Sequence, residues 1–563
     1  MLFDLYVVCT LLMAVPQKIR TWVKAALCVV EYVVALVDIY CFDNFGSTIT
    51  PSLVMLMGET NASEASNFVS AFFSLHTFVD GYFKWVLLII LMHVLYLAFH
   101  KKIREIMSVA RAWLCQCLSD RWFVAVKTLA EVAVLAMIAR WGIVEWQMDV
   151  AMLKQMRCTT TAEFEKSLKY RCGQVVYNSP LRRLYYSAIA NRLAAKNIET
   201  LIRVSEGAVV DSCSYRIPNI VLIIGESYGK VHSSLYGYRM KTTPRQEQLE
   251  SEGGLVKFTD VVSCYNLTSF VFKNMLSMHV VGDSCQWYEA PLFPSLFRKA
   301  GYHVTFISNE FAPELKATGD PYAFTGGFFL NDARMSRLLF DQRNERMHAL
   351  DNGLLNDYDG KFKKMEKEYN LTIFHLMGQH IKYNQRYPKG RARFCAADYD
   401  EFRRDLSQDC RRTLSEYDNA TLYNDSIVAE IVGRYAGRNA VVIYVPDHGE
   451  ECYEENRGYI CRNPYPQIDW EKAHYEYEIP FWIYCSPTMR KSQPELFAQI
   501  KASAKRRYMT DALPHMLMYL GGVSTKWYEE KHNILSPCYD EMRPRLLDGK
   551  VDYDSLRLKS KRR

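Results

Sequence analysis

The sequence lacks internal repeats, low-complexity tracts and any motif typical of nucleic-acid-binding proteins. Its net charge of +7 over 563 residues is mild, and lysine and arginine are dispersed rather than gathered in a stripe. Because nucleic-acid binding depends on a clustered basic surface, this composition argues against a nucleic-acid partner. The length is sufficient for two or more folded units with a sizeable core.

Long apolar runs are scarce after residue 146 and crowded before it. Before it, the candidate membrane spans are residues 2–15, 23–42, 85–99 and 123–144. About 20 residues cross a bilayer, so only the second run fits comfortably and the others need flanking residues. The fourth contains Lys127 and Glu131, which lie four apart and could pair on one helical face. These runs predict an α-helical transmembrane anchor over residues 1–146.

Basic residues are missing from the connection 43–83, whereas the connections near 18–24 and 101–111 are rich in them. The positive-inside rule therefore places the basic connections in the cytoplasm and the loop 43–83 outside. Four spans would leave the rest of the chain outside as well. Within the loop, Glu59 and Glu64 lie either on an interfacial helix facing the soluble domain or on a solvated loop.

The remaining chain alternates apolar and polar stretches in a soluble pattern. We expect a helical bridge over 147–215, a folded domain over 216–545 and a basic tail over 546–563. The candidate strands of the domain are residues 219–224, 256–262, 303–308, 372–377, 440–445 and 479–484. Strands that alternate with helices predict an α/β domain with a mostly parallel sheet sandwiched by helices.

Ionisable residues follow three of these strands. Glu226 follows the first, His380 comes after the fourth, and Asp447 with His448 follows the fifth directly. A lone histidine there is more often structural, and a lone acid can equally serve to cap a helix or a turn, but an adjacent Asp and His beside another strand-end acid are more specific. Ligands collect at the carboxyl ends of parallel strands, and carboxylate and imidazole suit Zn²⁺. The pattern therefore predicts a metal site.

A hydroxyl that could serve as nucleophile stands at Thr268, in the stretch SCYNLTSFVFKNM. Thr268 and Ser269 could open a helix, and a hydroxyl at that position is usually an N-cap. The same position favours catalysis, because a helix amino end attracts phosphate and a metal stabilises an alkoxide. The two roles are compatible.

Several motifs together carry a family resemblance. They are IIGES with HSSLYGY, NLTSFVFKNMLS, HLMGQHIKYNQRYP, PDHGE and the loop segment ETNASEA. The chain resembles the membrane phosphoethanolamine transferases of Gram-negative bacteria, in the alkaline phosphatase and sulfatase superfamily. The resemblance implies an alkaline phosphatase/sulfatase-like fold in a multi-pass protein of the bacterial inner membrane, with its catalytic domain in the periplasm.

The resemblance also implies roles for individual residues. It assigns catalytic zinc to Glu226, Thr268, Asp447 and His448, with Thr268 as nucleophile, and leaves a second zinc open. His380 and His474 would hold the transferred phosphate or that second zinc, and one of them would assist proton movement. Glu64 would help to receive the substrate. The implied reaction moves phosphoethanolamine from phosphatidylethanolamine to lipid A or the lipopolysaccharide core through a covalent threonine intermediate.

Alternatives remain open from the residues themselves. A related phosphodiesterase or glycerol-phosphate transferase would share the metal site, and a non-catalytic envelope binding protein could keep the fold. A formylglycine sulfatase is disfavoured, because Cys264 is not followed by the required P-x-R pattern.

Of 16 cysteines, eleven fall after residue 146, in the portion expected outside. Cys395 with Cys410, and Cys452 with Cys461, are close in sequence, as expected of periplasmic disulfides, and Cys158 with Cys172 is a third option. Asn274 stands where several members of the resembling family have a second cysteine that pairs near the nucleophile. This departure favours a core-directed or otherwise divergent branch over the lipid A enzymes and leaves the acceptor open.

Overall fold

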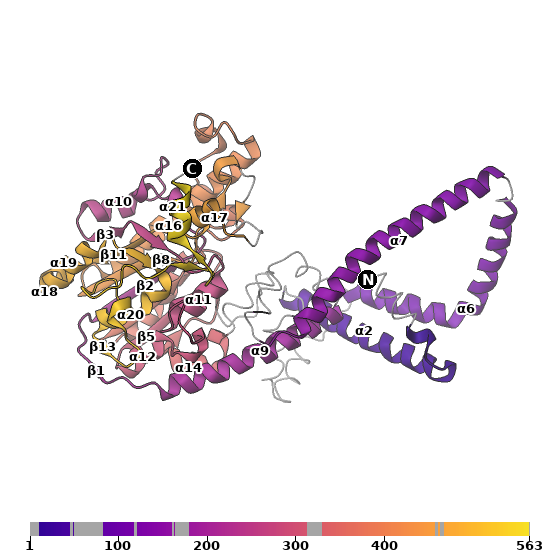
Figure 1. Ribbon diagram of the computed structural model, residues 1–563, viewed down its shortest axis with the longest axis horizontal. Coiled ribbons are helices and arrows are strands. Elements are labelled where there is room, and N and C mark those ends of the chain that lie inside the picture. The colour runs from indigo at the N-terminus through magenta and orange to yellow at the C-terminus, as the bar shows by residue number, and fades with distance from the viewer. Residues whose placement is uncertain are drawn as a thin grey trace. The chain divides into compact units, whose positions relative to one another are not determined.

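Figure 1 shows the protein as a computed structural model, in which the chain divides into two compact units. The structure describes residues 11–45, 49, 83–117, 121–159, 163, 180–311, 329–456, 460–461 and 467–561. One unit comprises Met1–Ala195 with Leu315–Phe324, and the other Lys196–Glu314 with Thr325–Arg563.

The first unit is helical. Its long helices are α2 (Gln17–Phe45), α6 (Phe83–Cys117), α7 (Arg121–Met156) and the start of α9 (Pro180–Gly207). The Tyr32 hydroxyl lies 2.7 Å from His93 Nδ1 and so joins α2 to α6. Lys127 and Glu131 pair at 3.8 Å, as their spacing predicts. Helices α2, α6 and α7 cover the predicted runs 23–42, 85–99 and 123–144, whereas most of the run 2–15 lies outside the described residues. Helix α7 continues through the predicted boundary at residue 146.

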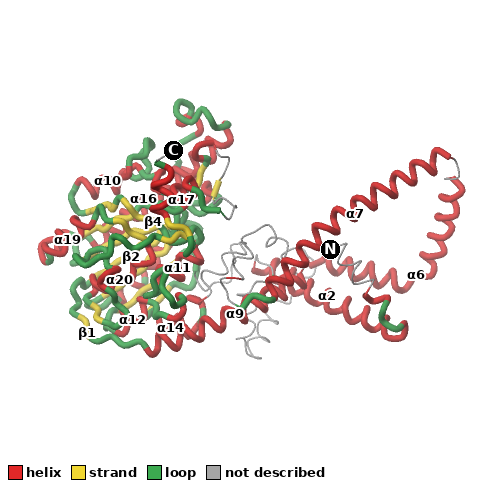
Figure 2. Tube along the Cα trace, in the orientation of Figure 1, coloured by secondary structure: helices red, strands yellow, loops and turns green. Residues whose placement is uncertain are grey.

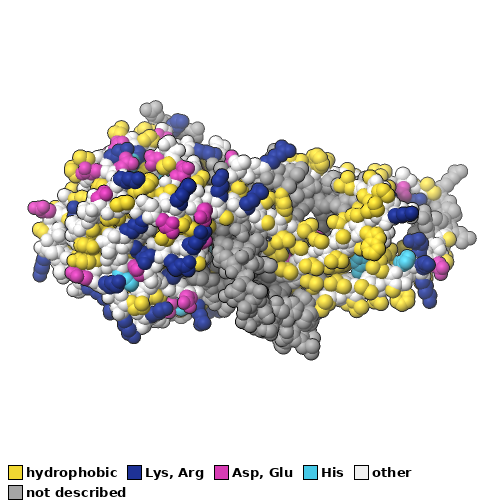
Figure 3. All heavy atoms as spheres, turned by 90° about the horizontal axis from the view of Figure 1, so that it is seen from below, with side chains coloured by type: hydrophobic (Ala, Val, Ile, Leu, Met, Phe, Trp, Pro, Cys, Tyr) yellow, Lys and Arg dark blue, Asp and Glu magenta, His cyan; other side chains and the backbone are white. Residues whose placement is uncertain are grey.

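Large apolar side chains of these helices are exposed. Trp22 on α2, Val109 on α6 and Leu129 on α7 are 77%, 69% and 75% exposed, and Figure 3 shows hydrophobic side chains crowding this unit's surface. Within the described ranges, no helix combines the length and apolar content needed to cross a membrane. The loop with Glu59 and Glu64 lies outside the described residues.

The second unit is built on a seven-stranded sheet in the order β3-β11-β8-β2-β7-β5-β6. In that order the strands are Leu255–Phe258, Phe481–Cys485, Ala440–Pro446, Asn219–Gly225, Asn370–His375, His303–Ser308 and Gln342–Arg343. β11 runs antiparallel to both neighbours, and the other pairings are parallel. The mostly parallel sheet is thus confirmed. Its central strands are buried along nearly their whole length, which explains their continuous apolar sequences.

Helices cover both faces of this sheet, as Figure 2 shows. On one face, α16 (Gln408–Tyr435) and α15 (Asn352–Gly360) pack into a cluster with Val221 and Ile223 of β2. The residues that alternate with these two point to the other face. The helix α20 (Leu513–Gly521) packs against both α11 (Thr268–Leu276) and α12 (Phe293–Lys299), and α12 also contacts β5.

Shorter elements complete the unit. The helices are α10 (Pro244–Ser251), α14 (Ala333–Leu339), α17 (Trp470–Glu476), α18 (Pro487–Ser492), α19 (Pro494–Ser503) and α21 (Tyr553–Ser560). The strands are β1 (Ser212–Cys213), β4 (Asp260–Val262), β9 (Glu451–Cys452), β10 (Ile460–Cys461), β12 (Arg507–Met509), β13 (Val523–Ser524), β14 (Leu546–Leu547) and β15 (Val551–Asp552).

Two predictions about this unit need correction. The run 256–262 forms two strands: β3 belongs to the main sheet, whereas β4 pairs with β12. The segment from 546 is not a loose basic tail, because β14, β15 and α21 fold onto the unit. Arg545 binds Asp260 and Asp554 at 2.7 and 2.6 Å, and the buried Tyr553 donates to Glu478 at 2.6 Å. These buried contacts hold the segment against the unit, although its basic composition would favour exposure to water.

Candidate active site

Glu226, Asp447 and His448 lie together because β2 and β8 are parallel neighbours in register. Gly225 pairs with Pro446 at the carboxyl ends of the two strands, and the Asp447 amide donates to the Gly225 carbonyl at 2.9 Å. The turn after β2 is tight, with Ser227 in the left-handed region at φ 52°. The three side chains are fully buried. Sheet register therefore fixes the acids and the imidazole at one point.

Thr268 joins them from the first position of α11. Its Oγ1 lies 3.5 and 3.3 Å from the two carboxylate oxygens of Glu226 and 3.4 Å from His448 Nε2. Leu267 is the residue at the cap of the helix, and no side chain makes a capping hydrogen bond there. The Thr268 hydroxyl thus faces the acids instead of capping the helix. Thr268 is half-buried, so the hydroxyl remains within reach of a ligand.

His448 shows that the cluster suits a cation. Its Nδ1 lies 2.7 Å from the Gly449 carbonyl, which can only accept, so Nδ1 carries a proton. In a neutral ring Nε2 is then an acceptor, and it faces Asp447 Oδ2 at 3.1 Å and Glu226 Oε1 at 3.8 Å. Acceptor atoms that face one another in a buried site repel unless a proton on His448 Nε2 or a metal ion lies between them.

The surroundings of the Asp447 and Glu226 carboxyl groups favour the binding of such an ion. Burial acts to raise the pKa of Asp447, but neighbouring His448 and hydrogen bonds, including one from the Ser227 amide at 2.9 Å, lower it overall. Ser227 Oγ also donates to Glu226 Oε1 at 2.7 Å. Zinc bonds of about 2.0–2.1 Å place tetrahedral oxygen and nitrogen ligands about 3.3 Å apart. The observed separations of 3.1 to 3.8 Å fit that spacing.

The other predicted site residues differ in where they lie relative to this cluster. His380 follows β7 on a segment whose Gln379 amide donates to the Glu226 carbonyl at 3.2 Å, so its backbone adjoins the site. His474 on α17 turns its Nδ1 to Glu478 at 2.8 Å and stacks on Trp470. Glu64 lies outside the described residues.

Glu310 and His375 adjoin the site and were not predicted from the sequence. His375 Nε2 lies 3.2 Å from Glu310 Oε2, and the two residues form a second potential metal group with Glu226. Ser308 pairs with His375 in the sheet register, so both strand ends reach the same edge. Glu226 was predicted because an ionisable residue stands at the end of a central strand. The same pattern describes Glu310 and His375.

Glu478 was also not predicted from the sequence, and its carboxylate links three parts of the domain. Its carboxylate receives Lys230 Nζ in a salt bridge, His474 at 2.8 Å and the Tyr553 hydroxyl at 2.6 Å. Burial acts to raise the pKa of Glu478, but its hydrogen bond to His474 and the charge of Lys230 lower it to about 2. Glu478 therefore holds His474 in place as a partner that is ionised at neutral pH.

The predicted cysteine bridges differ from the structure. Cys395 and Cys410 are free thiols, so the bridge between them is wrong for this structure. Cys395 caps its own short helix, accepting from the Asp398 backbone, while the Cys410 side chain contacts Tyr453. Cys452 is also free, and the Cys461 side chain lies outside the described atoms.

The model of the sulfatase family matches residues 218–523, so the chain belongs to the sulfatase family. Within it, the chain is 24% identical over 557 residues to phosphoethanolamine transferase EptC of Escherichia coli K12. It is 25% identical over 560 residues to phosphoethanolamine transferase CptA of Salmonella typhimurium. Each match covers 96% of this chain and 88% of the relative.

The fold is also that of a solved structure. The C-terminal periplasmic domain of E. coli EptC, crystallised in complex with zinc, matches 62% of this chain and 96% of its own. The TM-score is 0.51 at 24% identity. The sulfatase-like fold and the resemblance to phosphoethanolamine transferases are thereby confirmed.

Proposed function

We propose that the protein is a zinc-dependent transferase that moves phosphoethanolamine from phosphatidylethanolamine to lipid A or the lipopolysaccharide core. One observation carries the proposal: the Thr268 hydroxyl lies 3.3 to 3.5 Å from the Glu226 oxygens and His448 Nε2. The named relatives, matched over 96% of this chain, support the reaction class. A binding protein without activity would need no hydroxyl at this point.

Glu226, Thr268, Asp447 and His448 would hold the zinc, which supplies Lewis-acid neutralisation of phosphate charge and of a developing alkoxide. The sulfur-free set of carboxylate, hydroxyl and imidazole donors suits that ion. The zinc complex of the E. coli EptC domain supports zinc as the metal. A second zinc at His380 and His474 remains part of the proposal.

The chain's own residues account for the chemistry. The Thr268 oxygen attacks phosphorus in line, a new O–P bond forms, and the bond to the diacylglycerol oxygen breaks. The diacylglycerol oxygen leaves with the proton that the Thr268 hydroxyl gives up, and phosphoethanolamine remains on Thr268. An acceptor oxygen then attacks the same phosphorus and frees Thr268, while His380 or His474 moves the proton. The amino end of α11 faces the phosphate and stabilises its charge.

The proposed lipid substrates suggest that the helical unit acts as a membrane anchor. Both proposed donor and acceptor are lipids, so a membrane-held enzyme keeps its site within their reach. The exposed apolar side chains of α2, α6 and α7 support the proposal that residues 1–146 form that anchor, because such a surface is unfavourable in water. We place the domain 216–545 in the periplasm and Glu64 near the incoming lipid.

The test uses the full-length protein and its matched Thr268→Ala variant. With phosphatidylethanolamine labelled in its headgroup, the wild type should release diacylglycerol and retain label on a peptide containing Thr268. Mass spectrometry of lipopolysaccharide from cells with either protein should show the added group only with the wild type, and at which acceptor. Equal modification by both proteins would contradict the proposal.

A further inference from the structure

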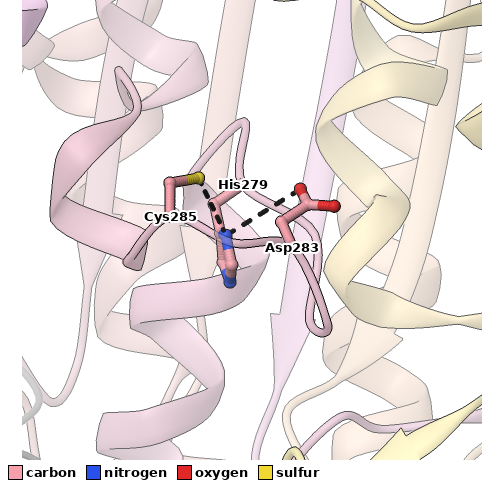
Figure 4. Close-up of side chains that lie close together, drawn as sticks. All are labelled: His279, Asp283 and Cys285. Atoms are coloured by element: carbon pink, nitrogen blue, oxygen red, sulfur yellow. Dashed lines mark hydrogen bonds and ion pairs between the residues drawn. The ribbon is translucent and has the colours of Figure 1, made fainter.

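A further group of side chains that could hold a metal ion lies in the turn that follows α11. Figure 4 shows His279, Asp283 and Cys285 pointing toward one another. His279 Nδ1 lies 3.5 Å from Cys285 Sγ and 3.9 Å from Asp283 Oδ2. The group is distinct from the residues assigned to catalysis. It draws a nitrogen, an oxygen and a sulfur donor from a short stretch of chain.

We propose that His279, Asp283 and Cys285 form a separate zinc site, at the surface of the catalytic unit, with its fourth position open to solvent. In a tetrahedral site, a Zn–N bond of about 2.0–2.1 Å and a Zn–S bond of about 2.3 Å place nitrogen and sulfur about 3.5 Å apart. The observed His279–Cys285 separation of 3.5 Å equals that value. The three donor atoms lie within 4.8 Å of one another, so small side-chain rotations complete the shell.

The turn holds its ligands in place through the backbone. Asp283 Oδ2 accepts from the Val280 amide at 3.0 Å, and the Asp283 amide donates to the Val280 carbonyl at 3.0 Å. Gly282 supplies the left-handed conformation at φ +105° that this tight turn requires. The Val281 amide binds Asp511, which is itself paired with Arg543. A turn anchored in this way lowers the entropic cost of gathering three ligands.

Burial and charge suit a divalent ion. His279 is 8% exposed, and burial lowers its pKa despite the nearby acids, so a neutral ring is available near pH 7. Burial first, and then Asp283, Glu289 and Glu529, raise the pKa of Cys285, so the metal would displace the thiol proton. Asp283 is 40% exposed and gives the ion a path to solvent.

The simpler alternative is a hydrogen-bonded turn, in which the Cys285 thiol donates to His279 and Asp283 only caps the backbone. The two interpretations differ in what cobalt does. A thiolate bound to Co²⁺ gives a sulfur-to-metal absorption band in the near ultraviolet, and the Thr268 site contains no sulfur. The band therefore distinguishes this site from the Thr268 site.

The experiment titrates full-length protein with Co²⁺ after metal removal. The wild type should show the thiolate band, and Cys285→Ser should abolish it. His279→Asn should weaken cobalt binding at least about a hundredfold. Even residues that only hydrogen-bond to a metal ligand change metal affinity by about 10–100-fold when they are replaced. Cys538→Ser, at an exposed free thiol, should keep the band, as should Glu226→Gln.

A band absent from the wild type, or unchanged in Cys285→Ser, would overturn the proposal. If the substitution of buried His279 impairs folding, Asp283→Asn on the exposed side provides the same measurement and should shift the titration in the same direction. Retention of the band in Glu226→Gln, with phosphoethanolamine transfer lost, separates this site from the proposed catalytic one.

Discussion

Thr268 and Glu226 meet across 42 positions of sequence, with the threonine Oγ1 3.3 Å from the glutamate Oε2. The contact joins the amino end of α11 to the carboxyl end of β2. It brings a hydroxyl with no capping role to a buried carboxylate.

Replacing Thr268 by alanine should lower transfer at least about a thousandfold, because the attacking oxygen is removed. Thr268 is half-buried, so stability should change by about 1 kcal/mol or less. Headgroup transfer and thermal unfolding measure the two effects. Thr413→Ala, which removes a hydroxyl that donates to the Asp409 carbonyl of its own helix at 3.1 Å, is the control and should retain activity. An active Thr268→Ala protein would refute the nucleophile.

Replacing Glu226 by glutamine should reduce the zinc content of the purified protein, because the amide removes one negative charge from the ligand set. Removing zinc with a chelator should also lower the unfolding temperature of the wild type, since the ion binds only the folded site. Metal analysis and thermal unfolding test both points. Glu495→Gln, at an exposed position on α19, should leave both values unchanged. Wild-type zinc content in Glu226→Gln would argue against this ligand.

Gly449→Ala should disrupt the loop that carries His448. A Cβ at Gly449 would lie 2.3 Å from the Tyr475 backbone oxygen, so α17 or the loop must move. We expect a loss of roughly 2 kcal/mol in stability together with reduced transfer. Gly437→Ala, where a Cβ meets nothing within 4 Å, should change stability by less than about 1 kcal/mol. Equal effects of the two substitutions would show that the close approach is relaxed in solution.

Glu478→Gln should destabilise the protein at neutral pH and not in strong acid. The pKa of Glu478 is lowered to about 2 from 4.5, so its ionised form stabilises the fold above 4.5 and loses this effect as pH falls toward 2. The shift corresponds to roughly 3 kcal/mol. Denaturation of wild type and variant at pH 7 and at low pH should show a difference that shrinks on acidification. A constant difference would exclude the charge as the cause.

His232→Asn should show the opposite pH dependence. Burial acts to lower the pKa of His232, but hydrogen bonds to Asp418 and Glu454 raise it from 6.5 to about 9. The charged ring therefore stabilises the fold fully below pH 6.5, and this contribution falls as pH rises through about 9. Denaturation should show a large difference between wild type and variant near pH 6 that narrows toward about pH 10. A difference that grows with pH would contradict a charged His232.

The sequence by itself determined the α/β class, most of the central strands and the positions of Glu226, Thr268, Asp447 and His448. The reason is local: buried parallel strands are continuously apolar, and an ionisable residue directly after such a strand marks its carboxyl end. The two-residue strand β6 escaped prediction because so short a run has no periodicity to detect.

Only the tertiary structure decided which strand ends are neighbours. Sheet order places β7 beside β2 and β5 beside β7, and so brings His375 and Glu310 next to Glu226. The same applies to Glu478, whose partners Lys230 and Tyr553 lie far away in sequence, and to the thiols of Cys395 and Cys410, which face different partners. Long-range contacts depend on how elements pack, and sequence spacing does not encode that packing.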